Sequence, residues 1–328
     1  MKAILKSVSR SFYLTIRFLP GPLREPVSLA YLLARATDTL ADTAAIPAGE
    51  RLATLDELGQ TIAGERELAT IEPSLVRFAA QQTDPRERKL IENLHAALDW
   101  LNRIEPHDRA EIREVLRTIV SGQRLDLERF AEAAKVTSLR NQAELDEYTY
   151  LVAGCVGKFW TRLGFHHFPK FANRSSEEMT ALGIKYGKGL QLINVLRDRP
   201  TDLANGRNYL PAEEVAKSSI EEVLWRERER AEQGITAGID YAASLTNWRL
   251  RYATALPALI GARTIALLRV PKASPEKIKV PRWEIRRIIR STAFAALSPL
   301  ALQALFQRLL SADPSDTRRE TTDHPSKT

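Results

Sequence analysis

The chain has little of what secreted or membrane-spanning proteins need. Its 328 residues include one cysteine, Cys155, so an internal disulfide is excluded and a reducing, cytoplasmic setting is expected. No run of about 20 apolar residues is free of charge, which argues against a spanning helix. The first 17 residues carry Lys2, Lys6, Arg10 and Arg17 and have no long apolar run, so we expect no signal peptide.

Several catalytic and binding signatures are also missing. There is no Gly-x-Ser-x-Gly elbow for a nucleophilic serine and no Gly-x-x-x-x-Gly-Lys loop to cradle phosphates. No basic run is interleaved with aromatic residues, so nucleic acid is not an expected partner. Runs of alternating apolar residues are absent as well, which excludes a fold built on sheets.

What the chain does have is positive charge and helical periodicity. The net charge is +7 and the pI is about 9.5. This surplus favours an anionic partner, such as a diphosphate or an acidic membrane surface, but scattered arginines on solvated faces would give the same total.

Helical periodicity covers most of the sequence. A helix is predicted over 27–45, and helix starts are predicted at Asp84-Pro85 and at Ser175 with Glu178 at capping-box spacing. We therefore predict an all-α protein of about ten helices, with one domain over 1–310 and a disordered polar tail over 311–328.

Two aspartate pairs share one spacing. Asp38 and Asp42 form the first pair, and Asp198 and Asp202 form the second. In a helix, residues four apart lie on one face, about 6 Å apart along the axis at a rise of about 1.5 Å per residue. Such carboxylates suit Mg²⁺, which takes hard oxygen ligands and shares them with substrate phosphates. If the two helices face each other, the sequence predicts a site for magnesium and diphosphate.

Polar residues surround both pairs at helical spacing. Unpartnered polar groups on an apolar helix destabilise a fold, and a metal cluster would give them partners. Arginine also matches phosphate oxygens through its planar fork. The residues concerned are Tyr31 and Arg35 near the first pair, and Gln191, Asn194, Arg197 and Arg207 near the second.

Three local features leave alternatives open. Pro200 removes a helical hydrogen bond, so Asp202 is expected past a kink. Gly154 and Gly157 in an apolar helix indicate close backbone approach or room for a bulky apolar ligand. The pair His166-His167 offers metal ligands, but no acid stands at ligand spacing, and a loop before Pro169 is predicted there instead.

These residues together resemble the squalene and phytoene synthase family of head-to-head prenyltransferases. The matching segments run in family order, and a looser match follows over 255–268. They are Ser9-Arg10-Ser11-Phe12, residues 31–42 from Tyr31 to Asp42, residues 148–157 from Tyr148 to Gly157, residues 191–202 from Gln191 to Asp202, and residues 206–211 from Gly206 to Pro211.

The resemblance implies an isoprenoid synthase bundle of helices with a central cavity. It implies that Asp38, Asp42, Asp198 and Asp202 hold Mg²⁺ on two prenyl diphosphates. It further implies that a set of residues positions diphosphate or shapes the pocket, namely Ser9, Arg10, Phe12, Tyr31, Arg35, Gln191, Asn194, Arg197 and Arg207. Lys279 and Arg282 resemble the basic element that closes the family's site, and they are the candidate NADPH contacts. Leu151 stands where squalene synthases commonly carry a tyrosine. Tyr150 and Tyr148 are near and could substitute, and Tyr150 is the candidate catalytic tyrosine.

The implied activity is that of a squalene synthase, which joins two farnesyl diphosphates through presqualene diphosphate. The alternatives are a phytoene or dehydrosqualene synthase that works without NADPH, a more distant prenyl-cation cyclase, and a non-catalytic assembly factor with the same fold. A hydrocarbon product also implies work at the inner face of a membrane. The apolar helix predicted over 292–310 would either rest on that bilayer or pack in the core. We expect a monomer or a weak dimer.

Overall fold

The computed structural model describes residues 1–8, 12–130, 135–269 and 278–313. These residues form α-helices almost throughout, which confirms the all-α prediction. The count exceeds the predicted ten, because short helices joined by tight turns fill much of the first hundred residues. The α-helices are α1 (Lys2–Val8), α2 (Phe12–Phe18), α3 (Gly21–Asp42), α4 (Ala48–Ala63), α5 (Glu72–Gln81), α6 (Pro85–Glu92), α7 (Leu94–Arg103), α8 (Pro106–Arg129), α9 (Gln142–Thr149), α10 (Cys155–His167), α11 (Ser176–Ala204), α12 (Ala212–Lys217), α13 (Ile220–Ser244), α14 (Trp248–Leu268), α15 (Arg282–Ala295) and α16 (Pro299–Ser311). A 3-10 turn η1 (Leu68–Thr70) and a π-helical segment η2 (Tyr150–Gly154) complete the helical elements.

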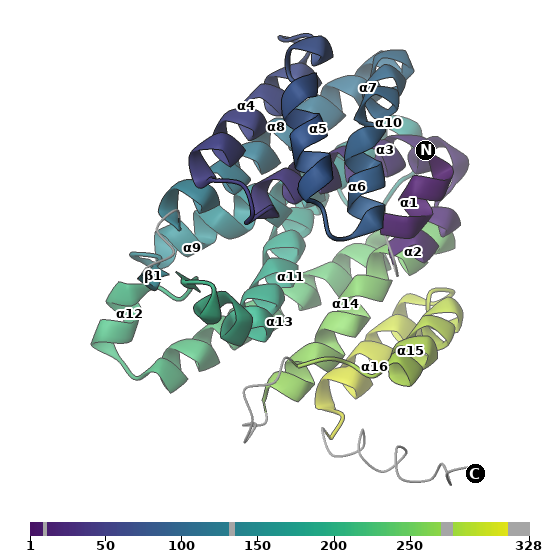
Figure 1. Cartoon of the computed structure of the whole chain (residues 1–328). Coiled ribbons are helices and arrows are strands. Elements are labelled where there is room, and N and C mark those ends of the chain that lie inside the picture. The colour runs from purple at the N-terminus through teal and green to yellow at the C-terminus, as the bar shows by residue number, and fades with distance from the viewer. Residues whose placement is uncertain (9–11, 131–134, 270–277, 314–328) are drawn as a thin grey trace, which may run out of the picture.

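Helix α11 occupies the middle of the bundle. It packs against α10, α13, α14 and η2, while α3, α4 and α8 form a neighbouring group (Figure 1). One hydrophobic core lies mainly among α1–α8 and α10, with residues from the start of α11, the end of α13 and the start of α14. A second lies among α9, α11, α13, α14, α15 and α16. Since α11 adjoins both halves, the face that carries Asp198 can lie opposite α3.

Local signals set several helix ends as predicted. The Asp84 carboxylate caps α6 by accepting from the backbone N–H of Arg86 at 2.9 Å. Ser175 and Glu178 form the capping box at the start of α11, with bonds of 3.2 and 2.9 Å. A helix cap of this kind stabilises a helix by about 1 kcal/mol. Helix α11 continues through Pro200 to Ala204, so Asp198 and Asp202 belong to one helix.

Two helix predictions were wrong in their bounds. The helix predicted over 27–45 is α3, which begins at Gly21 and ends at Asp42. The single helix predicted over 292–310 is split between α15 and α16, because Ser298 caps a new helix and Pro299 takes its first position. Residues 314–328 of the predicted tail lie outside the described part of the chain. No helix in that part is both long and apolar enough to cross a membrane.

A two-stranded parallel sheet, which the sequence did not predict, fixes the segment after α11. Strand β1 (Thr137–Ser138) pairs with β2 (Arg207–Asn208). Gly206 precedes β2 with φ of 77°, a left-handed conformation that glycine adopts without strain. The sharp turn lets β2 lie beside β1, and it brings Arg207 within reach of the end of α8.

Glycines allow α11 to approach its neighbours closely. A Cβ atom added at Gly157 of α10 would lie 2.0 Å from the carbonyl oxygen of Gly183 in α11. Gly189 of α11 and Gly234 of α13 meet in the same manner at the opposite contact. The close backbone approach that Gly154 and Gly157 suggested is therefore present at Gly157, which also borders an apolar cavity.

We expect Gly157→Ala to destabilise the fold by about 1–3 kcal/mol, because the added methyl group meets backbone atoms that cannot move alone. The urea midpoint of the purified protein measures this. Gly49→Ala in α4 is the matched control, since a Cβ there meets open space and should stabilise the helix by about 0.5–1 kcal/mol. A variant Gly157→Ala as stable as the unmodified chain would contradict the close-packing argument.

Candidate active site

A polar cavity of about 620 Å³ lies between α3, α8, η2 and α11. All four predicted aspartates line it: Asp38 and Asp42 from α3, and Asp198 and Asp202 from α11. The predicted opposition of two acidic helices across a common hollow is thus present in the structure. The remaining lining residues are Tyr31, Ala34, Arg35, Ala41, Ile119, Gln123, Asp126, Leu127, Tyr148, Val152, Val156, Gln191, Asn194, Val195, Arg197, Arg207 and Tyr209.

On the α3 wall, Arg35 is held between two acids. It donates to the Asp38 carboxylate at 2.6 Å and forms a second hydrogen bond with Glu87 of α6. Burial and the neighbouring Asp42 raise the pKa of Asp38 to about 6. Burial also raises the pKa of Asp42, against the opposing effect of Arg207. The raised pKa values show that ionising these two carboxylates costs more free energy here than in water. A cation bound beside them would offset that cost.

On the α8 wall, Asp126 binds two residues of the segment that follows α11 and so holds that segment beside the cavity. Its carboxylate accepts from the Tyr209 hydroxyl at 2.8 Å and from Arg207 at 3.2 Å. Burial raises the pKa of Asp126 as well. The Tyr209 ring stacks on that of Tyr148, with centroids 4.7 Å apart. Burial raises the pKa of Tyr148, so its hydroxyl keeps its proton.

The α11 wall carries the polar stripe predicted from the sequence. Arg197 makes two hydrogen bonds to Asp198, at 3.0 and 2.6 Å. Asn194 donates to Gln191 at 3.1 Å, and Gln191 donates to the Tyr148 hydroxyl at 3.2 Å. These bonds fix the side chains of α11 in the directions that face the cavity.

The cavity lining contains more carboxylates than guanidinium groups. Five carboxylates (Asp38, Asp42, Asp126, Asp198 and Asp202) face three guanidinium groups (Arg35, Arg197 and Arg207). With every carboxylate ionised, two negative charges remain uncompensated within the lining. An anionic ligand would be repelled from such a cavity, and a cation attracted to it, so an anion fits only together with cations.

Two apolar cavities adjoin the polar one. A cavity of about 240 Å³ shares Val152 and Val156 with it and is lined mainly by apolar side chains and glycines, together with Thr15 and Thr254. Another of about 290 Å³ shares Asn194 and Arg197 with it. The arrangement suits amphiphilic ligands that have a charged head and a hydrocarbon body.

Comparison with known proteins agrees with this geometry. The family model described as squalene/phytoene synthase matches residues 5–284. The chain belongs to the squalene/phytoene synthase family. Members of this family transfer prenyl groups in isoprenoid synthesis.

Relatives of both branches are similar to the chain. The squalene synthase of Saccharomyces cerevisiae is 29% identical over 213 residues, which are 64% of this chain and 44% of that protein. A bifunctional lycopene cyclase/phytoene synthase of Leptosphaeria maculans is 31% identical over 210 residues, which are 64% of this chain and 33% of that protein. The chain thus spans less than half the length of these relatives.

Solved structures of the family share the fold. The structure of TcSQS with the ligand BPH1237 superposes with a TM-score of 0.75 at 22% identity, and the match covers 100% of this chain and 92% of that one. A dehydrosqualene synthase in complex with a ligand gives a TM-score of 0.62 at 22% identity, covering 89% of this chain and 93% of that one. The isoprenoid synthase bundle implied by the sequence is confirmed.

Most of the site residues predicted from the sequence meet in the polar cavity of this squalene/phytoene synthase family member. Besides the four aspartates, these are Tyr31, Arg35, Gln191, Asn194, Arg197 and Arg207. Ser9 and Arg10 lie outside the described residues, and Phe12 is the first residue of α2. Lys279 and Arg282 are exposed, and neither lines a cavity found among the described residues.

The two candidate tyrosines lie in different surroundings. Tyr150 borders a small pocket beside Cys155 and Lys158, and it is not among the described residues that line the polar cavity. The first π-helical residue of η2 is Tyr150, and Tyr148 lies two positions earlier, in α9. Residues two apart on a helix face different ways. Tyr148 is therefore the tyrosine of this segment that faces the aspartates.

Sequence reasoning missed the contribution of α8 and of Glu87. Gln123 and Asp126 of α8 lie three residues apart and continue the buried stripe of Ile112, Leu116 and Ile119. A polar pair that continues an apolar stripe is the signal that would have found them. Glu87 lies in a short, charged helix and gives no comparable signal.

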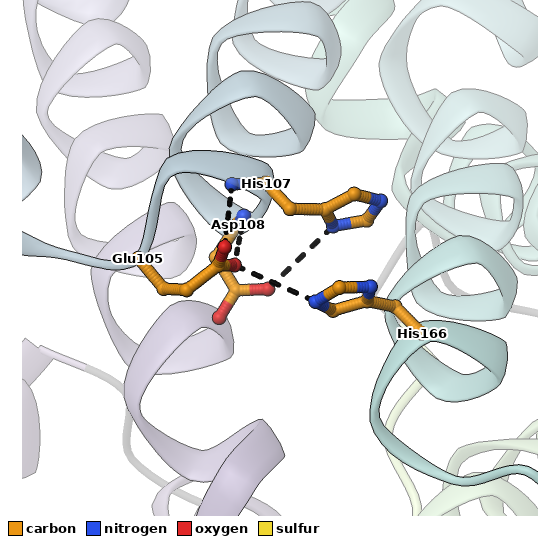
Figure 2. A group of neighbouring side chains, drawn as sticks. All are labelled: Glu105, His107, Asp108 and His166. Atoms are coloured by element: carbon orange, nitrogen blue, oxygen red, sulfur yellow. Dashed lines mark hydrogen bonds and ion pairs between the residues drawn. The ribbon is translucent and has the colours of Figure 1, made fainter.

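A second group of ligating side chains lies away from the cavity. Glu105, His107, Asp108 and His166 each place one ligand atom within 4.8 Å of the others, so this group can hold a metal ion. The loop predicted at His166-His167 was wrong, because α10 continues through His167 and ends with the bond from Phe168 N–H to Gly164. No acidic residue stands near His166 in the sequence, but Glu105 and Asp108 at the start of α8 lie beside it in the structure (Figure 2).

Proposed function

We propose that this protein catalyses the head-to-head condensation of two prenyl diphosphates, with farnesyl diphosphate as substrate and squalene as product. The observation that carries the proposal is the meeting of Asp38, Asp42, Asp198 and Asp202 in one cavity with apolar cavities beside it. A diphosphate would occupy the charged part, and its hydrocarbon chain the apolar part.

The four aspartates would hold Mg²⁺. Their donor set fits this ion, because it consists of carboxylate oxygens with a net negative surplus in the lining. Bound magnesium would supply electrostatic stabilisation of the departing diphosphate. The chain's own part is to keep the carboxylates oriented, which Arg35 does for Asp38 and Arg197 does for Asp198 through charged hydrogen bonds.

The arginines would also bind substrate directly. Arg35, Arg197 and Arg207 line the cavity and are partly exposed, so each has N–H groups beyond those already paired with carboxylates. A guanidinium group binds phosphate oxygens with a planar fork and keeps its charge at any physiological pH. Donors that are already in place stabilise developing charge without a cost of reorganisation at the moment of reaction.

The apolar cavities would hold the prenyl chains and exclude water from the cation. The 240 Å³ cavity is lined by Trp160, Leu190, Tyr241 and Pro257, among others. A carbocation formed at its mouth would meet ring faces and alkyl groups in place of water, which suppresses hydrolysis. Tyr148, at the junction of polar and apolar walls, is our candidate for handling the proton lost during condensation.

The products separate this proposal from its near alternatives. The purified protein is incubated with Mg²⁺ and either farnesyl or geranylgeranyl diphosphate, each with and without NADPH, and extracts are analysed by mass spectrometry. Squalene formed only with NADPH supports the proposal. Dehydrosqualene without NADPH, or phytoene from the longer substrate, would assign the chain to another branch. The NADPH arm also tests the proposed role of Lys279 and Arg282, whose side chains are exposed.

The same proposal places the protein at an anionic membrane surface. Phe294, Leu297 and Leu300 are 77, 63 and 78% exposed and lie at the end of α15, in the turn after it and at the start of α16. Helices α15 and α16 lie side by side at the C-terminal end of the bundle (Figure 1). Arg286 and Arg290 precede Phe294 at intervals of four, so the three residues share one face of α15. Exposed apolar groups beside arginines suit insertion among anionic headgroups.

Flotation with vesicles tests this placement. We expect the protein to float with vesicles of phosphatidylglycerol at low salt, and less with phosphatidylcholine alone. Phe294→Ser with Leu300→Ser should reduce flotation, because each exposed side chain contributes about 1.5–3 kcal/mol of apolar burial. Val76→Ser, at an equally exposed valine of α5, is the matched control. Equal flotation of all variants, or none at all, would remove this part of the proposal.

A further inference from the structure

We propose that Glu105, His107, Asp108 and His166 form a binding site for a transition metal ion, with Zn²⁺ as the best match. This site would join the start of α8 to the end of α10. It is separate from the candidate active site, because Asp108 and Asp126 are about 27 Å apart along α8 at a rise of about 1.5 Å per residue.

The four ligand atoms lie within 4.8 Å of one another, close to the spacing that a small metal ion needs. The rings of His107 and His166 are stacked, with centroids 3.7 Å apart and planes within 9° of parallel. Since an imidazole nitrogen binds a metal in the plane of its ring, one of these two partly exposed rings must turn out of the stack when an ion binds. His166 Nε2 lies 3.5 Å from Glu105 Oε2, and His107 Nδ1 lies 3.9 Å from Asp108 Oδ1 (Figure 2). Ligands around a tetrahedral zinc ion lie about 3.4 Å apart, given bonds of about 2.0–2.2 Å.

One of these atoms lacks a hydrogen-bond partner. His107 Nδ1 is closed off from solvent and has no hydrogen bond among the described residues, although a buried polar nitrogen ordinarily has one. A bound cation would give this nitrogen a partner. The wider group is open, since the side chains of Glu105, His107 and His166 are 48, 39 and 37% exposed. An ion can therefore enter, and the exposed side chains can turn to close the remaining gaps.

The surrounding bonds orient the ligands. Asp108 is 4% exposed and accepts from His167 Nε2 at 2.8 Å, which holds its carboxylate in place. Glu105 caps α8 by accepting from the backbone N–H groups of His107 and Asp108, each at 3.0 Å. Hydrogen bonds of this kind around a metal ligand raise its affinity, and each carboxylate oxygen keeps a further lone pair.

The donor set selects the class of metal. Two neutral imidazoles and two carboxylates give two nitrogens, two oxygens and a charge of −2, which balances a divalent cation. Imidazole suits Zn²⁺, Co²⁺ and Ni²⁺, whereas Mg²⁺ prefers oxygen ligands alone. Magnesium would therefore compete poorly for this site, whereas Co²⁺ or Zn²⁺ could also enter the aspartate cavity.

The test is metal titration of the full chain, without an affinity tag and stripped of metal. Co²⁺ is added, and the visible absorption of tetrahedral cobalt is followed. Zn²⁺ is then added as competitor, and calorimetry gives the stoichiometry. With excess Mg²⁺ present throughout to occupy the aspartate cavity, we expect one cobalt per chain at micromolar concentration, displaced by Zn²⁺. Zn²⁺ should also raise the thermal midpoint.

Variants locate the ion. His107→Gln with His166→Gln should abolish the cobalt spectrum and the thermal shift. His95→Gln, at an exposed histidine of α7, and Asp38→Asn with Asp198→Asn in the cavity should retain both. Circular dichroism verifies that each variant is folded. Absence of binding to the unmodified protein, or binding that survives loss of both histidines, would overturn the proposal.

Discussion

Replacing Asp198 by asparagine should lower kcat/KM for farnesyl diphosphate by roughly a thousandfold. The substitution keeps the shape of the side chain but removes one negative charge from the lining of the polar cavity. Loss of a metal-binding carboxylate should raise the barrier by about 4 kcal/mol, and each 1.36 kcal/mol is about a factor of ten in rate. Stability should change little, since Asp198 and its partner Arg197 are both partly exposed.

Controls separate loss of chemistry from loss of structure. Glu177→Gln removes a charge from the same helix, at an exposed position about 31 Å along the axis from Asp198 at a rise of about 1.5 Å per residue. It should retain full activity. Asp38→Asn should match Asp198→Asn, and the double variant should lose less than the two effects multiplied, since the residues act together. A folded Asp198→Asn protein with nearly normal activity would favour the non-catalytic assembly factor.

Glu284→Gln should destabilise the fold by about 3–5 kcal/mol. Glu284 of α15 and Arg263 of α14 are each 1% exposed, and their charged atoms lie 2.7 Å apart. Arg263 also donates to the carbonyl of Ala312 after α16, so it ties three segments together. Without the carboxylate, a buried guanidinium group keeps its charge but loses its counter-charge. Urea denaturation measures the change.

The double variant gives the sharper result. Arg263→Met combined with Glu284→Leu removes both charges and fills the volume with apolar groups, which is often neutral. It should recover most of the stability lost in Glu284→Gln. Arg287→Gln is the matched control, because Arg287 is 55% exposed and lies 3.7 Å from Glu284, so its loss should cost at most about 1 kcal/mol. A double variant no more stable than Glu284→Gln would show that the pair itself is stabilising.

The sequence predicted what helical periodicity controls. Asp38 with Asp42, and Asp198 with Asp202, stand at spacings that put each pair on one face, and both faces meet at the cavity. The capping box at Ser175 set the start of α11, because its partners are three residues apart. Such features depend on local geometry, which a single stretch of sequence contains.

Other features depend on contacts between distant segments, and the sequence did not reveal them. Arg263 lies in an apolar helix and its partner is in the next helix, so neither residue alone indicates a buried pair. Asp126 gains its role from Arg207 and Tyr209, about 80 residues later. Tyr148 and Tyr150 are two residues apart, and the change from α-helix to π-helix at Tyr150 made their directions hard to judge. The acids near His166 come from a different helix.

The cavities differ sharply in the water they would retain. Carboxylates and guanidinium groups line one compartment, whereas the 240 Å³ compartment beside it is walled mainly by alkyl groups, aromatic rings and glycine. A diphosphate entering the apolar side would shed its hydration shell without compensation, whereas a prenyl tail on the acidic side would stay wet. The difference in solvation between the two cavities would therefore orient a prenyl diphosphate, with its head in the polar cavity and its tail in the apolar one.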